Sequence, residues 1–396
     1  MNESRLRQAL LATAPPDEIG AQRRGWRVVR AAFTEREPTP WPIRHRRPLL
    51  AAAIAFAVLA AALSSPGRAV IREVRDAVGG KTVVVGIPQA KPALFSLPAE
   101  GRVLVAAPTG VWVVAADGAR RKLGNFEAGT WSPQGLFVGV SKRHQLAAVT
   151  PKGVVRWTLS RPRVRHARWA PSGFRVAYLS GSNLRVVAGD GTGDRRIGGA
   201  RAVAPVWQPV SEHVLAYVDR SGTVTVLETD QNQTLWTAAG VAADPLQLEW
   251  SADGARLLVA RRVGGRFMLV VFNAAGRRLQ TLILPGRFVD AAFAPSGHRI
   301  ALIRRVGQFS ELLVLQADTL RRQRTIFRGL GRFGDVAWSP GGRWLLFGWA
   351  SADQWLFIRS TDVSKIKAVS SLSVQFDPGG TGAGKFPRIE GWCCRG

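Results

Sequence analysis

The chain has 396 residues, a formal net charge of +28 and a hydrophobic share of 46%. That share, with 21% charged residues, excludes a wholly disordered chain, and a mean hydropathy of +0.02 excludes a polytopic membrane protein. Two cysteines in the whole chain exclude a disulfide scaffold and a multi-cysteine zinc fold. We therefore expect a globular core with an unusually basic surface.

Residues 1–47 are a basic tail in which short amphipathic helices are expected. After the Pro-Pro pair at 15–16, apolar residues recur at helical spacing among arginines: Ile19, Trp26, Val29 and Phe33. Short helices of this kind cannot bury a core alone, so we expect this face to dock on a partner or a lipid surface. The alternative is a solvated tail that only fixes the orientation of a membrane span.

Residues 48–67 carry no charge and have the minimum length for a helix that crosses a hydrocarbon core of roughly 30 Å. A buried core helix is one alternative, but the segment lacks a polar face. A cleaved signal peptide is another, although 47 residues precede the apolar run. We predict a single-pass signal anchor. Its N-terminus lies in the cytoplasm, because the reverse orientation would translocate the arginine-rich tail.

Residues 68–90 are expected to form a juxtamembrane stalk outside the cell. The pattern predicts a helix over residues 69–78 and a strand over Thr82-Val-Val-Val. This segment leads directly into a repeat region, so we expect little freedom between the membrane and that region.

The region after residue 90 repeats itself at a nearly constant period. Each repeat begins with an aromatic anchor and a Pro/Gly turn, as in Trp131-Ser-Pro-Gln-Gly, Trp169-Ala-Pro-Ser-Gly and Trp338-Ser-Pro-Gly-Gly. Two apolar strands, a turn of the Asp-Gly kind and a short basic strand follow, which is the pattern of one propeller blade. The anchors lie 36, 38, 38, 43, 43 and 45 residues apart and are Phe95, Trp131, Trp169, Trp207, Trp250, Phe293 and Trp338.

This unit resembles that of the TolB-type, WD-repeat-like β-propeller family, whose repeat reads W-S-P-D-G, strand, strand, D-x-D-G, R-R-L-T. The resemblance covers residues 90–380 and implies an all-β propeller over residues 91–396. Seven anchors predict seven blades, with residues 373–380 as a partial eighth copy that could close the ring. Six blades is the alternative, because the Phe95 repeat is the least typical.

No catalytic constellation stands out in the repeats. The five histidines are scattered without metal-ligand spacing, and no G-x-S-x-G elbow occurs. Asp190, Thr192 and Asp194 resemble part of a calcium loop, but its closing glutamate is missing. We therefore expect a protein that is not an enzyme, with no catalytic, cofactor-binding or metal site and no cofactor. An enzyme with its site in the propeller channel is the weakest of the alternatives, because His, Asp and Glu do not cluster along the sequence.

Cys393 and Cys394 are adjacent near the C-terminus of a domain that has no other cysteine. In an oxidising compartment they could form a vicinal disulfide, pair with another chain or remain free.

Most of the positive charge falls on residues 68–396, and such a field attracts polyanions. The arginines are scattered singly and in pairs, without a basic helix or an aromatic-plus-basic strand motif, which argues against nucleic acid. For a domain outside the cell, the available partners are a protein, anionic lipid headgroups or acidic wall polymers. We therefore expect a non-catalytic, membrane-anchored scaffold in the cell envelope that binds one of these.

A regulatory function is the alternative to a scaffold. A short helical tail, one span and a large outer domain resemble the layout of bacterial transmembrane anti-sigma factors. This resemblance covers about 65 residues and rests on layout, and the His/Cys zinc motif of one anti-sigma class is absent. It implies a cytoplasmic sigma factor as a partner of the tail.

Overall fold

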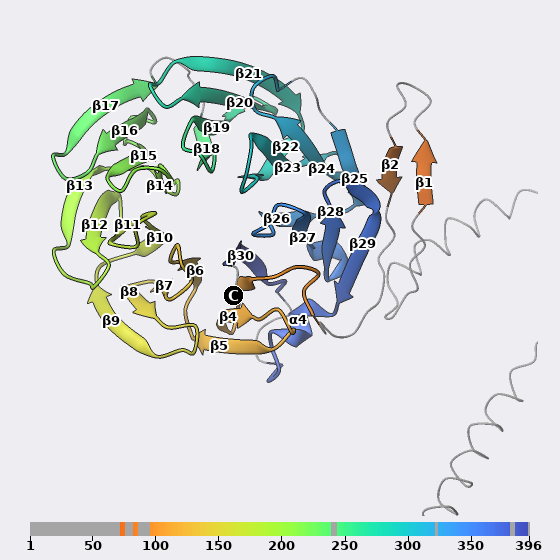
Figure 1. Cartoon of the computed structure of the whole chain (residues 1–396), viewed down its shortest axis with the longest axis horizontal. Coiled ribbons are helices and arrows are strands. Elements are labelled where there is room, and N and C mark those ends of the chain that lie inside the picture. The colour runs from red at the N-terminus through yellow and green to blue at the C-terminus, as the bar shows by residue number, and fades with distance from the viewer. Residues whose placement is uncertain are drawn as a thin grey trace, which may run out of the picture. The chain divides into compact units, whose positions relative to one another are not determined.

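The structure is a computed structural model that describes residues 96–238, 244–320, 324–380 and 385–394, and the backbone of residues 72–75 and 82–85. Seven antiparallel sheets follow one another around a closed ring, which Figure 1 shows face on. The predicted all-β propeller and its seven blades are therefore confirmed, and the six-bladed alternative is wrong.

We number the blades from 1 to 7 in chain order. Blade 1 contains β3 (Arg102–Ala107), β4 (Gly110–Val114), β5 (Arg120–Gly124) and β30 (Arg388–Cys393). Blade 2 contains β6 (Ala128–Trp131), β7 (Val138–Lys142), β8 (Gln145–Val149) and β9 (Val155–Ser160). Blade 3 contains β10 (Val164–Trp169), β11 (Arg175–Ser180), β12 (Asn183–Ala188) and β13 (Arg195–Gly199). Blade 4 contains β14 (Val206–Trp207), β15 (Val214–Val218), β16 (Val224–Glu228) and β17 (Gln233–Ala238).

The three remaining blades follow in chain order, and blades 5 and 6 have strands of seven or eight residues. Blade 5 contains β18 (Asp244–Trp250), β19 (Arg256–Val263), β20 (Arg266–Asn273) and β21 (Arg278–Pro285). Blade 6 contains β22 (Arg287–Phe293), β23 (Arg299–Val306), β24 (Phe309–Gln316) and β25 (Arg324–Leu330). Blade 7 contains β26 (Phe333–Trp338), β27 (Trp344–Trp349), β28 (Gln354–Arg359) and β29 (Asp362–Ser370), with the short helices η1 (Ala350–Ala352) and α4 (Leu372–Gln375).

The core of the ring lies between the blades. The buried side chains form seven clusters, and each cluster joins two neighbouring blades: for example, Phe327 of blade 6 packs with Phe347 and Trp349 of blade 7. The second and third strands of a blade are buried on both faces, whereas outer strands such as β9 alternate between exposed and half-buried residues. A single blade could not cover both of its faces, so the closed ring is the unit that folds.

The ring closes through the last described strand of the chain. β30 pairs with β3 over Arg102↔Cys393 to Ala106↔Arg388 and so supplies the innermost strand of blade 1. The expected closing copy at residues 373–380 is wrong, because Leu372–Gln375 forms helix α4 and the chain reaches the ring only at Arg388.

The helix expected at residues 69–78 is wrong, whereas the assignment of residues 68–90 as a stalk stays a prediction. The expected strand at residues 82–85 is present as β2 (Thr82–Val85), but Arg72–Arg75, inside the predicted helix, forms the strand β1. β1 pairs with β2, and β2 continues the sheet of blade 6 through a parallel bridge between Val85 and Arg328. The physical reason is that the outer edge of blade 6 is available for pairing: a segment that adds to a free sheet edge gains backbone hydrogen bonds to that edge, which an isolated helix lacks.

Blade 4 departs from its neighbours at its innermost strand. β14 has two residues, whereas β10 and β18 have six and seven. Pro205 directly precedes β14, and a proline has no N–H to donate to a strand ladder. The irregular repeat around Trp207 thus corresponds to a shortened strand within an otherwise regular ring.

Candidate functional site

The aromatic anchors end the innermost strands and join neighbouring blades. Trp131, Trp169, Trp207, Trp250, Phe293 and Trp338 are the last residues of β6, β10, β14, β18, β22 and β26. The indole N–H of Trp207 donates to the carbonyl of Arg168 in blade 3 at 2.9 Å, and that of Trp338 donates to Ala292 in blade 6 at 3.0 Å. Phe95 lies outside the described residues. In blade 1 the corresponding place in β30 belongs to Trp392, which the repeat spacing did not predict.

The innermost strands surround a central channel with a cavity of about 780 Å³. This volume is within the range of small-molecule sites, but its charged lining differs from the mostly apolar walls of such sites. The charged lining residues come from blades 1, 3, 5, 6 and 7 and the segment before blade 2: Glu127, Arg165, His166, Arg168, Glu249, Asp290, Asp335, Arg388 and Glu390. The sequence did not indicate this cluster, because the ring brings together residues that are far apart along the chain.

Three polar side chains in the channel join consecutive blades. Gln247 of blade 5 donates to the carbonyl of Ala291 and accepts from its N–H, at 2.8 and 3.1 Å. Asp290 accepts from the N–H of Val336 at 2.9 Å, and Asp335 accepts from the N–H of Ile389 at 3.0 Å. Each of the three stands three residues before the anchor of its own blade. These contacts satisfy backbone donors of the next blade and hold the ring together.

Glu249 has no such structural role. It precedes the anchor Trp250 and lines the channel, and its carboxyl group forms no hydrogen bond or ion pair with any described residue. Burial raises the pKa of Glu249 to about 8, with a contribution from the charge of Asp290 and an opposing one from Arg168. Burial and the charge of Asp335 raise the pKa of Asp290 to about 7. The carboxyl groups of Glu249 and Asp290 are therefore partly protonated near neutral pH.

The basic residues of the channel are concentrated on β10. Arg165, His166 and Arg168 line the channel from this strand, with Arg388 from β30. Burial and these three arginines lower the pKa of His166 to about 4, so its imidazole is neutral at pH 7. Arg388 donates to Glu390 at 3.0 Å, whereas Arg165 and Arg168 form no ion pair among the described residues. The channel thus presents cationic and carboxylic groups to the same space.

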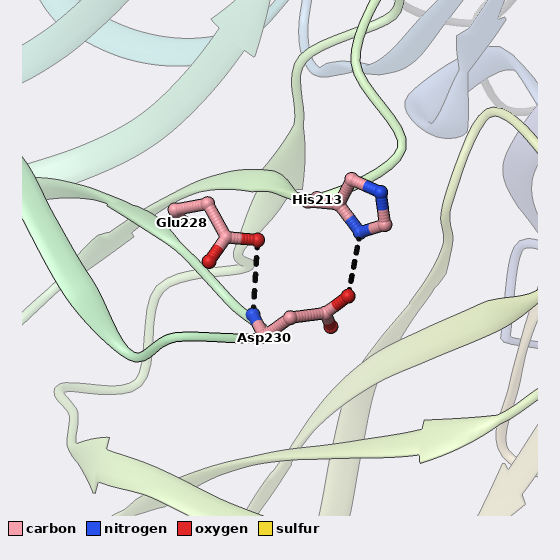
Figure 2. Close-up of side chains that lie close together, drawn as sticks. All are labelled: His213, Glu228 and Asp230. Carbon is pink, nitrogen blue, oxygen red and sulfur yellow. Dashed lines mark hydrogen bonds and ion pairs between the residues drawn. The ribbon is translucent and has the colours of Figure 1, made fainter.

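Among the described residues, one group has side chains close enough to hold a metal ion: His213, Glu228 and Asp230 (Figure 2). Nδ1 of His213 lies 2.9 Å from Oδ2 of Asp230, and Glu228 accepts the N–H of Asp230 at 3.0 Å. Arg175 of blade 3 also binds both oxygens of Asp230, at 3.1 and 2.6 Å. A guanidinium in that place competes with a metal ion, so this group is better explained as a contact between blades 3 and 4.

The same arrangement recurs further along the ring. Arg256 of blade 5 pairs with Asp318 of blade 6 at 3.1 Å, and His298 contacts Asp318 at 2.9 Å. His298 and His213 each stand directly before the second strand of their blades, which supports a structural role for both groups.

The loop that resembles a calcium site is already occupied by cations. The carboxylate of Asp194 pairs with Arg161 and Arg185, each at 2.6 Å, and accepts the hydroxyl of Tyr178 at 2.7 Å. Asp190 accepts from the backbone and hydroxyl of Thr192. The loop is a contact between blades 2 and 3.

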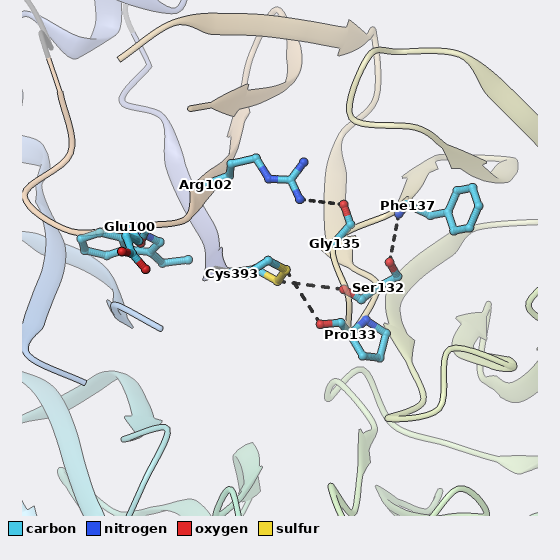
Figure 3. The surroundings of a disulfide bond; sticks show 9 residues. Glu100, Arg102, Ser132, Pro133, Gly135, Phe137 and Cys393 are labelled. Atoms are coloured by element: carbon cyan, nitrogen blue, oxygen red, sulfur yellow. Dashed lines mark hydrogen bonds between the residues drawn. A yellow bond between two sulfur atoms is a disulfide. The ribbon is translucent and has the colours of Figure 1, made fainter. Parts of the chain in front are cut away.

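Cys393 and Cys394 lie at the closure of the ring and are joined by a disulfide bond (Figure 3). Cys393 is the last residue of β30, and its sulfur lies 4.0 Å from the carbonyl oxygen of Ser132 in blade 2. Beside them, Arg102 donates to the carbonyl of Gly135 at 2.8 Å. The pair therefore sits where the first and last parts of the propeller meet.

The predicted docking face of Ile19, Trp26, Val29 and Phe33 and the predicted span at residues 48–67 lie outside the described residues. Within the described part of the chain, no helix has the length and apolar character that a membrane crossing requires.

Comparisons with known proteins show the fold alone. No family model and no curated protein matches the chain. The β-propeller domain of Cps50 (Swd1) from Myceliophteria thermophila is similar to it at 12% identity, with a TM-score of 0.51 over 62% of this chain and 86% of that one. KlHsv2 with its loop 6CD replaced by a Gly-Ser linker is also 12% identical, with a TM-score of 0.50 over 66% of this chain and 93% of that one. Both likenesses support the β-propeller fold.

Proposed function

We propose that the protein is a non-catalytic, membrane-anchored β-propeller that binds a protein or an anionic polymer of the cell envelope. The observation that carries this proposal is the preformed, charged channel of the ring. Its walls are set by strands that are hydrogen-bonded from blade to blade, so a ligand meets a rigid surface and little ordering opposes binding. Arg165 and Arg168, which form no ion pair among the described residues, offer the charge that an acidic ligand would need.

The placement of the ring outside the cell rests on the apolar segment 48–67 and the arginines before it. Reporter fusions at the C-terminus test it: alkaline phosphatase is expected to be active and a cytoplasmic fluorescent reporter inactive. The reverse pattern would place the ring in the cytoplasm and remove envelope polymers from the partners.

Binding can be tested by sedimentation of the purified full-length chain with isolated, protein-free cell wall. We expect cosedimentation that decreases as salt increases, because the attraction is between opposite charges. Substitution of Arg165 and Arg168 by Gln should reduce it severalfold. The matched control replaces Arg156 and Arg277, two exposed arginines outside the channel, with Gln. Equal loss in both variants would show that net charge alone, and not the channel, attracts the polymer.

A second candidate function follows from Glu249 and Asp290. Carboxyl groups with pKa values near 7 to 8 in a channel are suited to general acid-base catalysis. Glu249 is the stronger candidate for that role, because Asp290 already accepts the N–H of Val336. A hydrolase screen with Glu249→Gln as the matched inactive variant tests this; activity equal in both proteins would refute it.

A further inference from the structure

A second cavity, of about 740 Å³, adjoins the channel; most of its lining comes from blades 5 and 6, and the rest from β10 of blade 3 and residues 202–204 before blade 4. It shares His166, Arg168, Gln247 and Asp290 with the lining of the channel. Three further arginines line it from separate places: Arg262 from the end of β19, Arg266 from the start of β20 and Arg287 from the start of β22. All three are exposed.

These three guanidinium groups have no counterion in the described part of the protein. Arg262, Arg266 and Arg287 form no hydrogen bond and no ion pair with any described side chain. Other arginines are paired within their own blade, as Arg185 is with Asp194 and Arg304 is with Glu311 at 2.8 Å. Unpaired arginines occur elsewhere on this basic surface, but here three of them line a single cavity.

The backbone also brings like charges together at this place. In the pairing of β22 with β23, Arg287 stands directly opposite Arg305. Arg305 also has no ion pair among the described residues, and like charges directly opposite on neighbouring strands destabilise a sheet. Gly286 lets the backbone at the start of β22 lie close to the backbone of β23, because a Cβ at this position would overlap the carbonyl oxygen of Arg305. A bound anion would offset this repulsion.

The acids near the cavity are already engaged. Asp290, the one carboxylate in the lining, accepts the N–H of Val336. Asp244 stands opposite Arg262 in the pairing of β18 with β19, but its carboxylate pairs with Arg201 at 3.2 Å. The floor of the cavity is apolar, where Phe267 and Phe288 pack with ring centroids 5.6 Å apart. Among the described residues, the cavity therefore has a cationic rim with no acid free to neutralise it.

We propose that this cavity binds a compact, multiply phosphorylated ligand through Arg262, Arg266 and Arg287. The planar guanidinium group binds phosphate oxygens with two parallel hydrogen bonds, and three such groups match a ligand with several phosphate oxygens close together. The phosphates could belong to a soluble molecule or to a lipid headgroup, since both offer the same chemistry. This proposal rests on the proposed function only in treating the ring as a binding module.

The test is titration calorimetry of the purified full-length chain, in nonionic detergent, with inorganic triphosphate. We expect saturable binding of one triphosphate per chain that weakens with added salt. A charge-assisted hydrogen bond contributes enough that loss of one arginine should weaken the Kd about tenfold. The triple variant R262Q/R266Q/R287Q is therefore expected to show no measurable binding. The control triple variant R156Q/R277Q/R278Q has the same net charge and alters no residue of this cavity, so it should bind as the native chain does.

Absence of triphosphate binding to the native chain, or equal loss in both triple variants, would overturn the proposal. Thermal unfolding of each variant verifies that the ring is intact. If the native chain binds vesicles of cardiolipin, whose headgroup carries two phosphates, and triphosphate competes, the phosphates belong to a headgroup; if triphosphate binds and these vesicles do not, the ligand is soluble. Wall binding without triphosphate binding would refute this proposal alone, whereas a cytoplasmic C-terminus would refute only the envelope placement.

Discussion

The carboxylate of Asp335 in blade 7 accepts a hydrogen bond from the N–H of Ile389 in β30 at 3.0 Å, and so holds the closing strand of the ring. The two residues are 54 positions apart in the chain. The neighbouring pair, Asp290 and Val336, makes the equivalent contact one blade earlier at 2.9 Å. Asp290 and Asp335 therefore line the channel and also join neighbouring blades of the ring.

Substitution of Asp335 by Ala is expected to destabilise the ring by about 1 to 3 kcal/mol, because the N–H of Ile389 would stay buried without an acceptor. Asp335→Asn is the matched control, since an amide oxygen can still accept this bond. Burial raises the pKa of Asp335, so removal of its charge should cost little. Urea unfolding measures the loss of unfolding free energy in each of the two variants, provided that the m-value is unchanged. Equal losses in Ala and Asn would show that the charge, and not the hydrogen bond, is required.

The raised pKa of Glu249 predicts that the free energy of unfolding depends on pH. Its pKa is about 8 in the folded chain and near 4.5 when unfolded, so its favourable contribution is complete below pH 4.5 and is lost as pH rises to about 8. A difference of one between the folded and unfolded pKa values corresponds to about 1.4 kcal/mol, and water in the channel reduces the effect, so we expect a loss on the order of 2 to 4 kcal/mol.

Glu249→Gln should therefore flatten the curve of unfolding free energy between pH 5 and 8 and leave a variant more stable than the native chain at pH 8. Glu212→Gln, at an exposed position in blade 4, is the control and should retain the native slope. An unchanged slope in Glu249→Gln would mean that Glu249 ionises normally in the channel. Asp290 is expected to leave a residual slope near pH 7.

The repeat pattern made the blades predictable, because each blade reuses a turn after an aromatic anchor. Closure was harder to predict, since Trp392 follows Trp338 by 54 residues and α4 lengthens that interval beyond the regular period. The channel was missed for another reason: Glu249, Asp290 and Glu390 are isolated acids in the sequence, and only the ring brings them together. Comparison of the residues one to three positions before each predicted anchor would have revealed Glu249 and Asp290 but not Glu390, because Trp392 was not predicted as an anchor.

His298 joins blades 5 and 6 in a way that depends on pH. Its two ring nitrogens lie 2.8 Å from Asp253 and 2.9 Å from Asp318, and hydrogen bonds to these two carboxylates raise its pKa. The contribution of protonated His298 to stability is complete below its unfolded pKa near 6.5 and is lost as pH rises through its higher folded pKa.

Because both carboxylates are about half exposed, we expect His298→Gln to cost about 0.5 to 1 kcal/mol at pH 5.5 and less at pH 9. Thermal unfolding at the two pH values checks this, with His144→Gln at an exposed position in blade 2 as the control. A loss that is the same at both pH values would contradict it.

Asp194 should be the most sensitive of the polar contacts between blades. Its side chain is 4% exposed and balances Arg161 of the segment after blade 2 and Arg185 of blade 3. Asp194→Ala would leave two guanidinium groups without a counterion, and breaking such a buried pair costs about 3 kcal/mol. Burial opposes ionisation of Asp194, but hydrogen bonds from Arg185, Tyr178 and Arg161 outweigh it and lower the pKa. This stabilisation is therefore present above the unfolded pKa near 3.8 and is lost in acid.

Asp190→Ala is the control for Asp194→Ala, because Asp190 lies in the same loop but is exposed, and among the described residues its carboxylate accepts hydrogen bonds only from Thr192. We expect a much smaller loss of unfolding free energy for Asp190→Ala, since surface substitutions away from ion clusters change stability little. Urea unfolding at pH 7 distinguishes the two variants. Similar losses for Asp190 and Asp194 would mean that the loop, and not the ion cluster, joins blades 2 and 3.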